Sequence, residues 1–208
     1  WTSSLSTRAD PTATEVDSES SERSTMRPLL GKSGHGRQSI RCRISRIESA
    51  MSIEHQQEVR GGCYCGEVRF LVSGGVSPLV SGYCHCASCR HAHAAPLYQV
   101  AWISTEDFEI TQGSECLKWY TRSAVTREHL RRYFCVNCGT KVFNAYEGPF
   151  GGQQVTTTGL FPSLFDDPIL ARSERWAPRL HMHCEDSLMD VARINDGLPK
   201  LAKGADGG

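Results

Sequence analysis

Cysteine is the residue type whose number and spacing in this sequence predict chemistry. The chain of 208 residues contains ten cysteines. Seven of them fall into three tight clusters, which are Cys63-Tyr64-Cys65, Cys84-His85-Cys86-Ala87-Ser88-Cys89 and Cys135-Val136-Asn137-Cys138. Cys-x-Cys and Cys-x-x-Cys spacings place two thiolates on one side of a turn, where both can reach one ion at about 2.3 Å. The clusters therefore predict a soft metal in tetrahedral coordination, and zinc is the default choice.

Three other interpretations of the clusters are open: an iron–sulfur cluster, disulfide pairing and a single zinc ribbon. Near-adjacent cysteines make poor disulfides, and nothing in the chain directs it to an oxidising compartment. A ribbon usually separates its two cysteine pairs by roughly 15 to 20 residues, whereas 45 residues separate Cys89 from Cys135. Seven ligands divide most naturally into a closed structural site of four and an open site of three, whose last position can take water or substrate.

Composition and charge limit the classes of partner. Lys plus Arg and Asp plus Glu both number 23, so the formal net charge is zero, and we expect no nucleic-acid partner. Hydrophobic residues make up 39% of the chain, and the longest apolar runs are far shorter than the roughly 18 residues that span a bilayer. We therefore expect a soluble, cytoplasmic protein with no membrane contact.

Short strands separated by turn residues are the elements that must position the cysteines. Apolar alternation and β-forming residues predict strands at residues 68–72, 97–103, 108–111, 116–121, 131–134, 141–146 and 154–160. Only residues 163–170 and 185–193 suggest helix. We expect Trp102, Trp119 and Trp176 in the core, and His181 and His183 as structural histidines on a strand. The pattern predicts a mainly β domain whose loops carry the chemistry.

The first fifty residues differ in composition from the rest of the chain. They hold eleven serines and almost no clustered apolar side chains, so we expect residues 1–50 to be a disordered or non-native leader and Met51 to be the true start. An alternative is a basic interaction arm that uses Arg37, Arg41, Arg43 and Arg46. After a short lead-in at 51–60, residues 61–203 are expected to form the zinc-binding domain and residues 204–208 a flexible tail.

Three stretches, in this order, resemble the glutathione-dependent formaldehyde-activating enzymes and their relatives, which include the CENP-V domain. They are Gly-Gly-Cys-Tyr-Cys-Gly-Glu-Val-Arg-Phe at 61–70, Cys-His-Cys-Ala-Ser-Cys-Arg at 84–90, and Phe-Cys-Val-Asn-Cys-Gly-Thr-Lys-Val-Phe at 134–143. The resemblance covers roughly residues 61–203. It implies a mainly β fold similar to the Mss4-like, or β-tent, zinc-binding fold.

The resemblance also implies ligands and a reaction. One structural zinc would be held by Cys63, Cys65, Cys135 and Cys138, and one catalytic zinc by Cys84, Cys86 and Cys89. The implied activity is that of a carbon–sulfur lyase similar to S-(hydroxymethyl)glutathione synthase, with glutathione as co-substrate and an aldehyde such as formaldehyde as its partner. Arg90, His85 and His91 are candidates for binding the co-substrate or the developing oxyanion. The alternative is a non-catalytic zinc module, or a glutathione carrier, that acts through a protein partner.

Overall fold

A computed structural model describes residues 56–121 and 129–205. The chain divides into two units, Trp1–Ile40 and Arg41–Gly208, and every described residue belongs to the second. The predicted leader, the start at Met51 and the alternative basic arm therefore lie outside the described residues. Within the described part of the chain, no helix is both long enough and apolar enough to cross a membrane.

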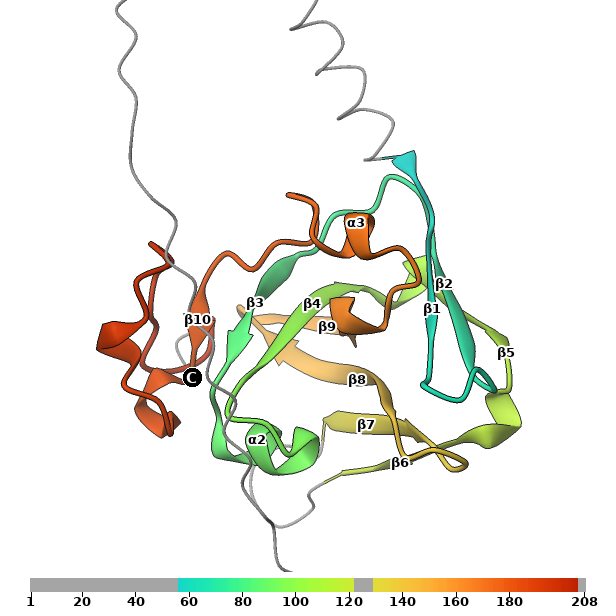
Figure 1. The fold of residues 1–208 in the computed structure, drawn as a ribbon, viewed down its shortest axis with the longest axis horizontal. Coiled ribbons are helices and arrows are strands. Elements are labelled where there is room, and N and C mark those ends of the chain that lie inside the picture. The colour runs from blue at the N-terminus through green and yellow to red at the C-terminus, as the bar shows by residue number, and fades with distance from the viewer. Residues whose placement is uncertain (1–55, 122–128, 206–208) are drawn as a thin grey trace, which may run out of the picture. The chain divides into compact units, whose positions relative to one another are not determined.

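The described residues form the mainly β architecture that the sequence predicts (Figure 1). Three antiparallel strands form a small sheet in the order β1-β2-β5, and seven strands form a larger sheet in the order β10-β3-β4-β9-β8-β7-β6. The bounds are β1 Val59–Gly62, β2 Arg69–Val72, β3 Val80–Cys84, β4 Tyr98–Ser104, β5 Phe108–Gln112, β6 Leu117–Tyr120, β7 Leu130–Cys135, β8 Lys141–Phe150, β9 Gln153–Leu160 and β10 His181–Met182.

The hairpin of β8 and β9 is the longest pairing in the larger sheet, and a two-residue turn fixes its register. Phe150 pairs with Gln153, so Gly151 and Gly152 make the turn, and their φ angles are 57° and 81°. Positive φ at both central residues is the requirement of a type I′ hairpin turn, which glycine meets without strain. Strand β8 therefore extends to Phe150, well past the predicted end at residue 146.

The main core lies between the two sheets and is closed by the segment that follows β9. Phe70 of β2 is 1% exposed and contacts the rings of Phe108 and Phe165. Trp176 is fully buried and packs edge-on against Phe165, with 5.1 Å between the ring centroids. The predicted core position of Trp176 is thus confirmed.

Trp119 does not lie in the core, so that prediction is wrong. Its side chain is 51% exposed, because β6 is the outer strand of the larger sheet. The guanidinium of Arg131 lies over the exposed ring, 5.2 Å from its centroid, and this cation–π contact stabilises the ring at the surface. Trp102 is half-buried and belongs to the wall of a cavity described below.

Helical structure is confined to short pieces, of which α2 Ala87–His93 and α3 Pro168–Ala171 are α-helical. The helix predicted at 163–170 is broken into the 3-10 turn η3 Pro162–Leu164 and α3. The break occurs because the ring of Pro168 keeps Asp167 extended, and the Asp167 carboxylate then caps the new helix by accepting from Ile169 N. Residues 185–193 likewise form no continuous helix, only the 3-10 turns η4 Cys184–Asp186 and η5 Val191–Arg193.

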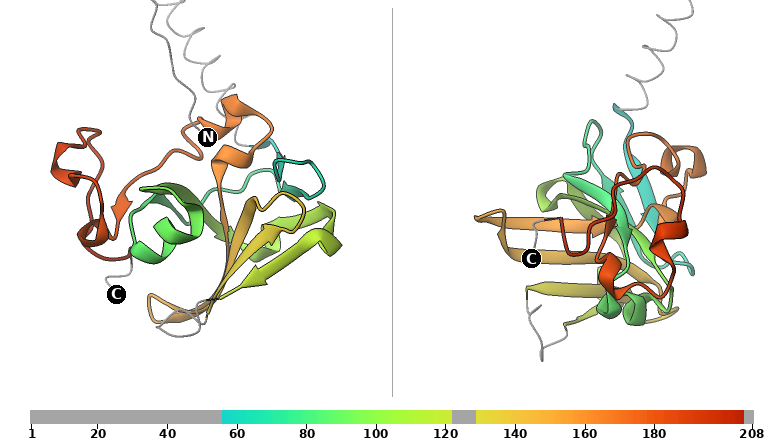
Figure 2. Two further views of the ribbon diagram at one scale, coloured as in Figure 1. Left: turned by 60° about the horizontal axis from the view of Figure 1, so that its bottom comes forward. Right: turned by 90° about the vertical axis from the view of Figure 1, so that its left-hand side faces the viewer.

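Helix α2 follows soon after β3 and lies beside β10 and the segment after it. Figure 1 and both views of Figure 2 show this arrangement. Strand β10 pairs in parallel with β3, and the carboxylate of Asp186 accepts a hydrogen bond from Ala87 N at 3.2 Å. Strand β10 and the residues just after it therefore contact the loop that carries the second cysteine cluster.

Candidate functional site

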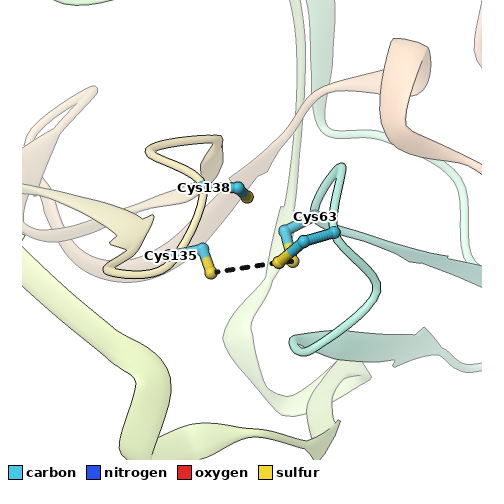
Figure 3. A group of neighbouring side chains, drawn as sticks. Cys63, Cys135 and Cys138 are labelled. Carbon is cyan, nitrogen blue, oxygen red and sulfur yellow. Dashed lines mark hydrogen bonds between the residues drawn. The ribbon is translucent and has the colours of Figure 1, made fainter.

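The first and third cysteine clusters meet at one place. Cys63 and Cys65 follow β1, while Cys135 ends β7 and Cys138 precedes β8, and all four sulfur atoms lie within 4.8 Å of one another. Figure 3 shows the side chains of Cys63, Cys135 and Cys138 directed into the space between their two loops. The Sγ atoms of Cys63 and Cys65 are 3.5 Å apart, and those of Cys65 and Cys135 are 3.8 Å apart. Sulfurs around a tetrahedral zinc are about 3.8 Å apart, so the donor set fits zinc.

The two loops reach this geometry because each is a tight knuckle. Gly66 N donates to Cys63 O at 3.1 Å, and Gly139 N donates to Cys135 O at 2.9 Å. Both glycines have positive φ, 82° and 75°, which a side chain would oppose. Val68 N also donates to Cys63 Sγ at 3.3 Å, as backbone amides do to a thiolate held at a metal.

Thr140 links the two knuckles. Its hydroxyl accepts a hydrogen bond from Tyr64 N at 3.1 Å and lies 3.2 Å from Cys138 Sγ. Although burial acts in the opposite direction, hydrogen bonds from Thr140 and Cys65 lower the pKa of Cys138 to about 6. Burial raises the pKa of Cys135 to about 12. The hydrogen bonds of Thr140 thus favour the thiolate form of Cys138.

The second cluster forms a separate group of three buried cysteines at the start of α2. Cys84 ends β3, Cys86 is the N-cap of α2 and Cys89 lies in its first turn. Their sulfur atoms also lie within 4.8 Å of one another, and Cys89 N donates to Cys86 Sγ at 3.3 Å. The structure thus divides the seven clustered cysteines into groups of four and three, and both donor sets are the soft thiolates that select zinc.

Two side chains that the sequence did not single out contact this three-cysteine group. The hydroxyl of Tyr98 donates to Cys89 Sγ at 3.4 Å. Arg132 Nη2 lies 3.9 Å from Cys89 Sγ and donates to Ser88 Oγ at 2.9 Å. Hydrogen bonds from Cys84 and Cys86, and then the contacts with Tyr98 and Arg132, lower the pKa of Cys89. Tyr98 and Arg132 therefore favour the thiolate form of Cys89.

A signal for Arg132 was present in the sequence. On β7 it lies two residues from Leu130, so both side chains point to the same face of the strand. Leu130 is 5% exposed and Arg132 is 1% exposed. A charged residue at an inward position is rarely buried without a partner, and here the partners are Ser88 and Cys89. Tyr98 gave no such signal, because a tyrosine in an apolar strand is also typical of core packing.

The three predicted co-substrate ligands lie elsewhere around α2. His85 is fully buried, and its ring nitrogens lie 2.8 Å from His181 Nδ1 and 2.9 Å from Ser187 Oγ. Arg90 Nε donates to the backbone oxygen of His85 at 3.1 Å. His91 is exposed on α2. Their role toward a co-substrate stays a prediction.

His181 and His183 occupy different settings. His181 is buried in β10, and its Nε2 lies 2.6 Å from Asp196 Oδ2. His183 follows the end of β10 with φ of 56°, in the left-handed region, so it does not continue the strand as expected.

A cavity of about 410 Å³ adjoins the three-cysteine group. Cys84, Cys89 and Tyr98 form one part of its wall. The rest is contributed by side chains of β3, β4, β7, β8 and β9, by Met182 and His183, and by residues 204 and 205. A molecule held near Cys89 would thus face a partly open cavity of the size that small-molecule sites have.

A solved structure and a protein-family model both match this chain. A solved structure that matches is the crystal structure of a Rhodobacter sphaeroides protein, at 20% sequence identity and a TM-score of 0.39, over 51% of this chain and 87% of that chain. No curated protein matches the chain. The family model described as glutathione-dependent formaldehyde-activating enzyme matches residues 58–186, a range that holds both cysteine groups. The chain therefore belongs to the family of glutathione-dependent formaldehyde-activating enzymes.

Proposed function

We propose that this protein is a zinc-dependent carbon–sulfur lyase, which forms and cleaves the adduct of a small thiol and an aldehyde. Glutathione and formaldehyde are the substrates that family membership suggests. The observation that carries the proposal is the group of Cys84, Cys86 and Cys89, whose sulfurs can share one ion and of which Cys84 and Cys89 border a cavity. A metal with three protein ligands keeps a position for substrate, whereas four ligands make a closed structural site.

The four-cysteine group and the three-cysteine group would have different roles, one structural and one catalytic. Cys63, Cys65, Cys135 and Cys138 join the loop after β1 to the loop between β7 and β8, which suits a structural zinc. At the other site, zinc held by three thiolates would favour an external thiolate over hydroxide as its fourth ligand, because the formal charge of minus one weakens its power to acidify water. Hydrolysis is therefore disfavoured there.

The surrounding side chains prepare the site for a thiol. Tyr98 and Arg132 place hydrogen-bond donors against Cys89 Sγ, which stabilises negative charge on that sulfur. The apolar wall of the cavity limits the access of water to a bound thiolate, which stays more nucleophilic when it is poorly hydrated.

The reaction needs no electron donor or acceptor. In the synthetic direction the thiol sulfur attacks the carbonyl carbon and one carbon–sulfur bond forms. The π electrons of the carbonyl group move to its oxygen, which takes up one proton in exchange for the proton that the thiol has lost. The reverse sequence releases thiol and aldehyde. Thr157 and His129 line the cavity and can donate to this oxygen. Arg90 and His91 stay predicted donors, whereas both ring nitrogens of the third predicted donor, His85, already have hydrogen-bond partners.

The wider setting is part of the same proposal. We propose a zinc-binding domain at residues 61–203 to which the end of the lead-in at 51–60 also belongs, because Val59 of β1 is fully buried. The protein would be cytoplasmic, and its partners would be a small thiol and an aldehyde. The formal net charge of zero supports the absence of a nucleic-acid partner.

The test is the substitution Cys86→Ala in the full chain, with Cys184→Ala as the matched control. Cys184 is half-buried and belongs to neither cysteine group. We expect two zinc ions per wild-type chain by elemental mass spectrometry and one in Cys86→Ala, with unchanged circular dichroism. NMR exchange spectroscopy with ¹³C-formaldehyde and glutathione should show catalysed exchange in the wild type and Cys184→Ala, and only the uncatalysed rate in Cys86→Ala.

Two results would contradict the proposal. Retention of both ions and of the full exchange rate by Cys86→Ala would show that the three-cysteine group is not the site. Glutathione binding by the wild type without any catalysed exchange would favour the carrier function instead.

A further inference from the structure

The cavity beside the three-cysteine group is larger and more apolar than formaldehyde requires. Its volume is about 410 Å³, whereas an apolar cavity of roughly 150 Å³ is enough for one benzene molecule. Its wall includes Val80, Val100, Trp102, Leu130, Tyr146 and Val155. Formaldehyde has two heavy atoms and would leave nearly all of this wall without a contact.

The wall of this cavity, called the chamber below, also has few charged side chains. Among the described residues that line it, none is a lysine, arginine, aspartate or glutamate. Glutathione carries two carboxylates and one ammonium group, and charged groups lose much free energy when they are buried without partners. The polar ends of glutathione therefore fit the chamber poorly, while an apolar group fits it well.

The chamber continues from the reacting position to the surface. Cys84, Cys89 and Tyr98 line one part of it. Leu79 and Phe150 line another part and are 66% and 39% exposed. A substituent attached to a carbon that reacts at the cysteine group can thus extend along the apolar wall, while the polar part of the thiol stays in solvent.

We infer that this chamber is a subsite for an aromatic or medium-length alkyl substituent on the aldehyde, so that the preferred substrate is larger and more apolar than formaldehyde. The inference rests on the proposed function, because that function places the aldehyde at the three-cysteine group. Burial of each methylene in such a subsite should raise affinity about fourfold, and a phenyl ring should raise it well over tenfold.

Val155 provides the means to test the subsite without altering the cysteines. It lies in β9, is half-buried and lines the chamber. Val155→Phe adds a ring to the wall and should reduce the space for a large substituent. The next residue, Thr156, is exposed and points to the opposite face of the strand. Thr156→Phe is therefore the matched control, with the same new side chain on the other face.

The first measurement is binding of thioethers that imitate the adduct but cannot react. Isothermal titration of the zinc-loaded full chain would compare S-methylglutathione with S-benzylglutathione. We expect the benzyl compound to bind at least tenfold more tightly to the wild type and to Thr156→Phe, and this ratio to fall toward one in Val155→Phe.

The second measurement is the rate of adduct formation by glutathione with formaldehyde, propanal, hexanal and phenylacetaldehyde. We expect kcat/KM, corrected for the uncatalysed rate, to increase from propanal to hexanal and phenylacetaldehyde. Val155→Phe should lower the ratio of phenylacetaldehyde to formaldehyde at least tenfold, and Thr156→Phe should not.

The outcomes separate this inference from the proposed function. Equal binding of the methyl and benzyl compounds, or a benzyl preference that Val155→Phe leaves intact, overturns the subsite even if formaldehyde reacts. A benzyl preference that Val155→Phe abolishes supports the subsite. If that preference is found but no aldehyde is turned over faster than without protein, the subsite stands and the proposed function fails.

Discussion

The imidazole rings of His85 and His181 are joined by a buried hydrogen bond, with 2.8 Å between His85 Nε2 and His181 Nδ1. The pair lies within a longer chain, because His85 Nδ1 is 2.9 Å from Ser187 Oγ and His181 Nε2 is 2.6 Å from Asp196 Oδ2. The Asp196 carboxylate can only accept, so His181 carries a proton on Nε2. With both rings neutral, His85 Nε2 then donates to His181, and Ser187 donates to His85. This chain ties the loop of the second cysteine cluster to the C-terminal segment.

Asp196, the carboxylate at the end of this series of hydrogen bonds, predicts a dependence of the free energy of unfolding on pH. The hydrogen bond from His181, and then that from Lys200, hold the pKa of Asp196 below its ordinary value of 3.8. A carboxyl group with a lowered pKa stabilises the fold above its ordinary pKa and loses this contribution as the pH falls below it. We therefore expect Asp196→Asn to lower the free energy of unfolding at pH 6 and to have a progressively smaller effect as the pH falls from about 5 to 3.

Urea unfolding at each pH would measure this effect as the difference between wild type and Asp196→Asn. The difference is the readout because both proteins release metal in acid. Asp190→Asn, which changes an exposed carboxylate, should leave the profile of the wild type unchanged. A difference that stays constant from pH 6 to pH 3 would contradict the role of the charge.

The hydrogen bond from Tyr98 to Cys89 leads to a prediction about metal affinity. Tyr98→Phe keeps the ring but removes the hydroxyl that donates to Cys89 Sγ at 3.4 Å. Loss of a hydrogen bond to a metal ligand typically costs about 10- to 100-fold in metal affinity or activity. We expect the affinity of the three-cysteine group for zinc to fall by this factor, while that of the four-cysteine group is unchanged.

Competition with a chromophoric chelator would resolve the two groups as two phases of zinc release. Tyr120→Phe is a suitable control, because Tyr120 lies on the outer strand β6 and its ring faces Lys141. Equal zinc affinities in wild type and Tyr98→Phe would show that the hydroxyl does not influence the site.

Much of the fold could be predicted from the sequence, because period-2 patterns and turn residues are local signals. The strands predicted at 97–103, 108–111 and 154–160 agree closely with β4, β5 and β9. The grouping of the cysteines into four and three is also the one that the structure shows. These features depend on spacing along the chain, which is visible in one sequence.

The features that could not be predicted depend on contacts between distant segments. Helix α2 is a short helix within a cysteine-rich loop, and its apolar content gives no helical period. The strand expected at His181 is β10, but it ends at Met182, and its parallel pairing with β3 joins segments that are far apart in the chain. The contact of Tyr98 and Arg132 with Cys89 brings together residues from β4, β7 and α2, so no local pattern reveals it.

The four-cysteine group predicts a strong dependence of folding on metal. Its members Cys65 and Cys135 are 70 residues apart in the chain, so the ion would close a long loop. Binding of zinc contributes roughly 10–16 kcal/mol in zinc-finger peptides, which is comparable with the whole stability of a domain, about 5–15 kcal/mol. We expect Cys135→Ser, or removal of zinc by a strong chelator, to abolish the cooperative thermal transition.

Cys116→Ser is the control for this effect, since Cys116 is half-buried next to β6 and belongs to neither group. It should melt within a few degrees of the wild type. A soluble Cys135→Ser protein with the wild-type melting temperature would show that the four-cysteine group does not stabilise the fold.

The start of the domain can be located by two truncations. Arg175 is 7% exposed and donates from Nη1 to Gln57 O and from Nε to Val76 O. Val59 of β1 is fully buried in the core. A chain that begins at Met51 keeps all of these contacts, so we expect it to fold and to bind two zinc ions as the full chain does.

A chain that begins at Gly61 lacks the acceptor at Gln57 and the side chain of Val59. The loss of an acceptor for a buried cation and of a buried valine should together cost about 3–6 kcal/mol. Urea unfolding and zinc content would compare the two truncations with the full chain. If the chain from Met51 aggregated or lost zinc, residues before it would have to be part of the domain, and if the chain from Gly61 were as stable as the full chain, β1 would have no part in the core.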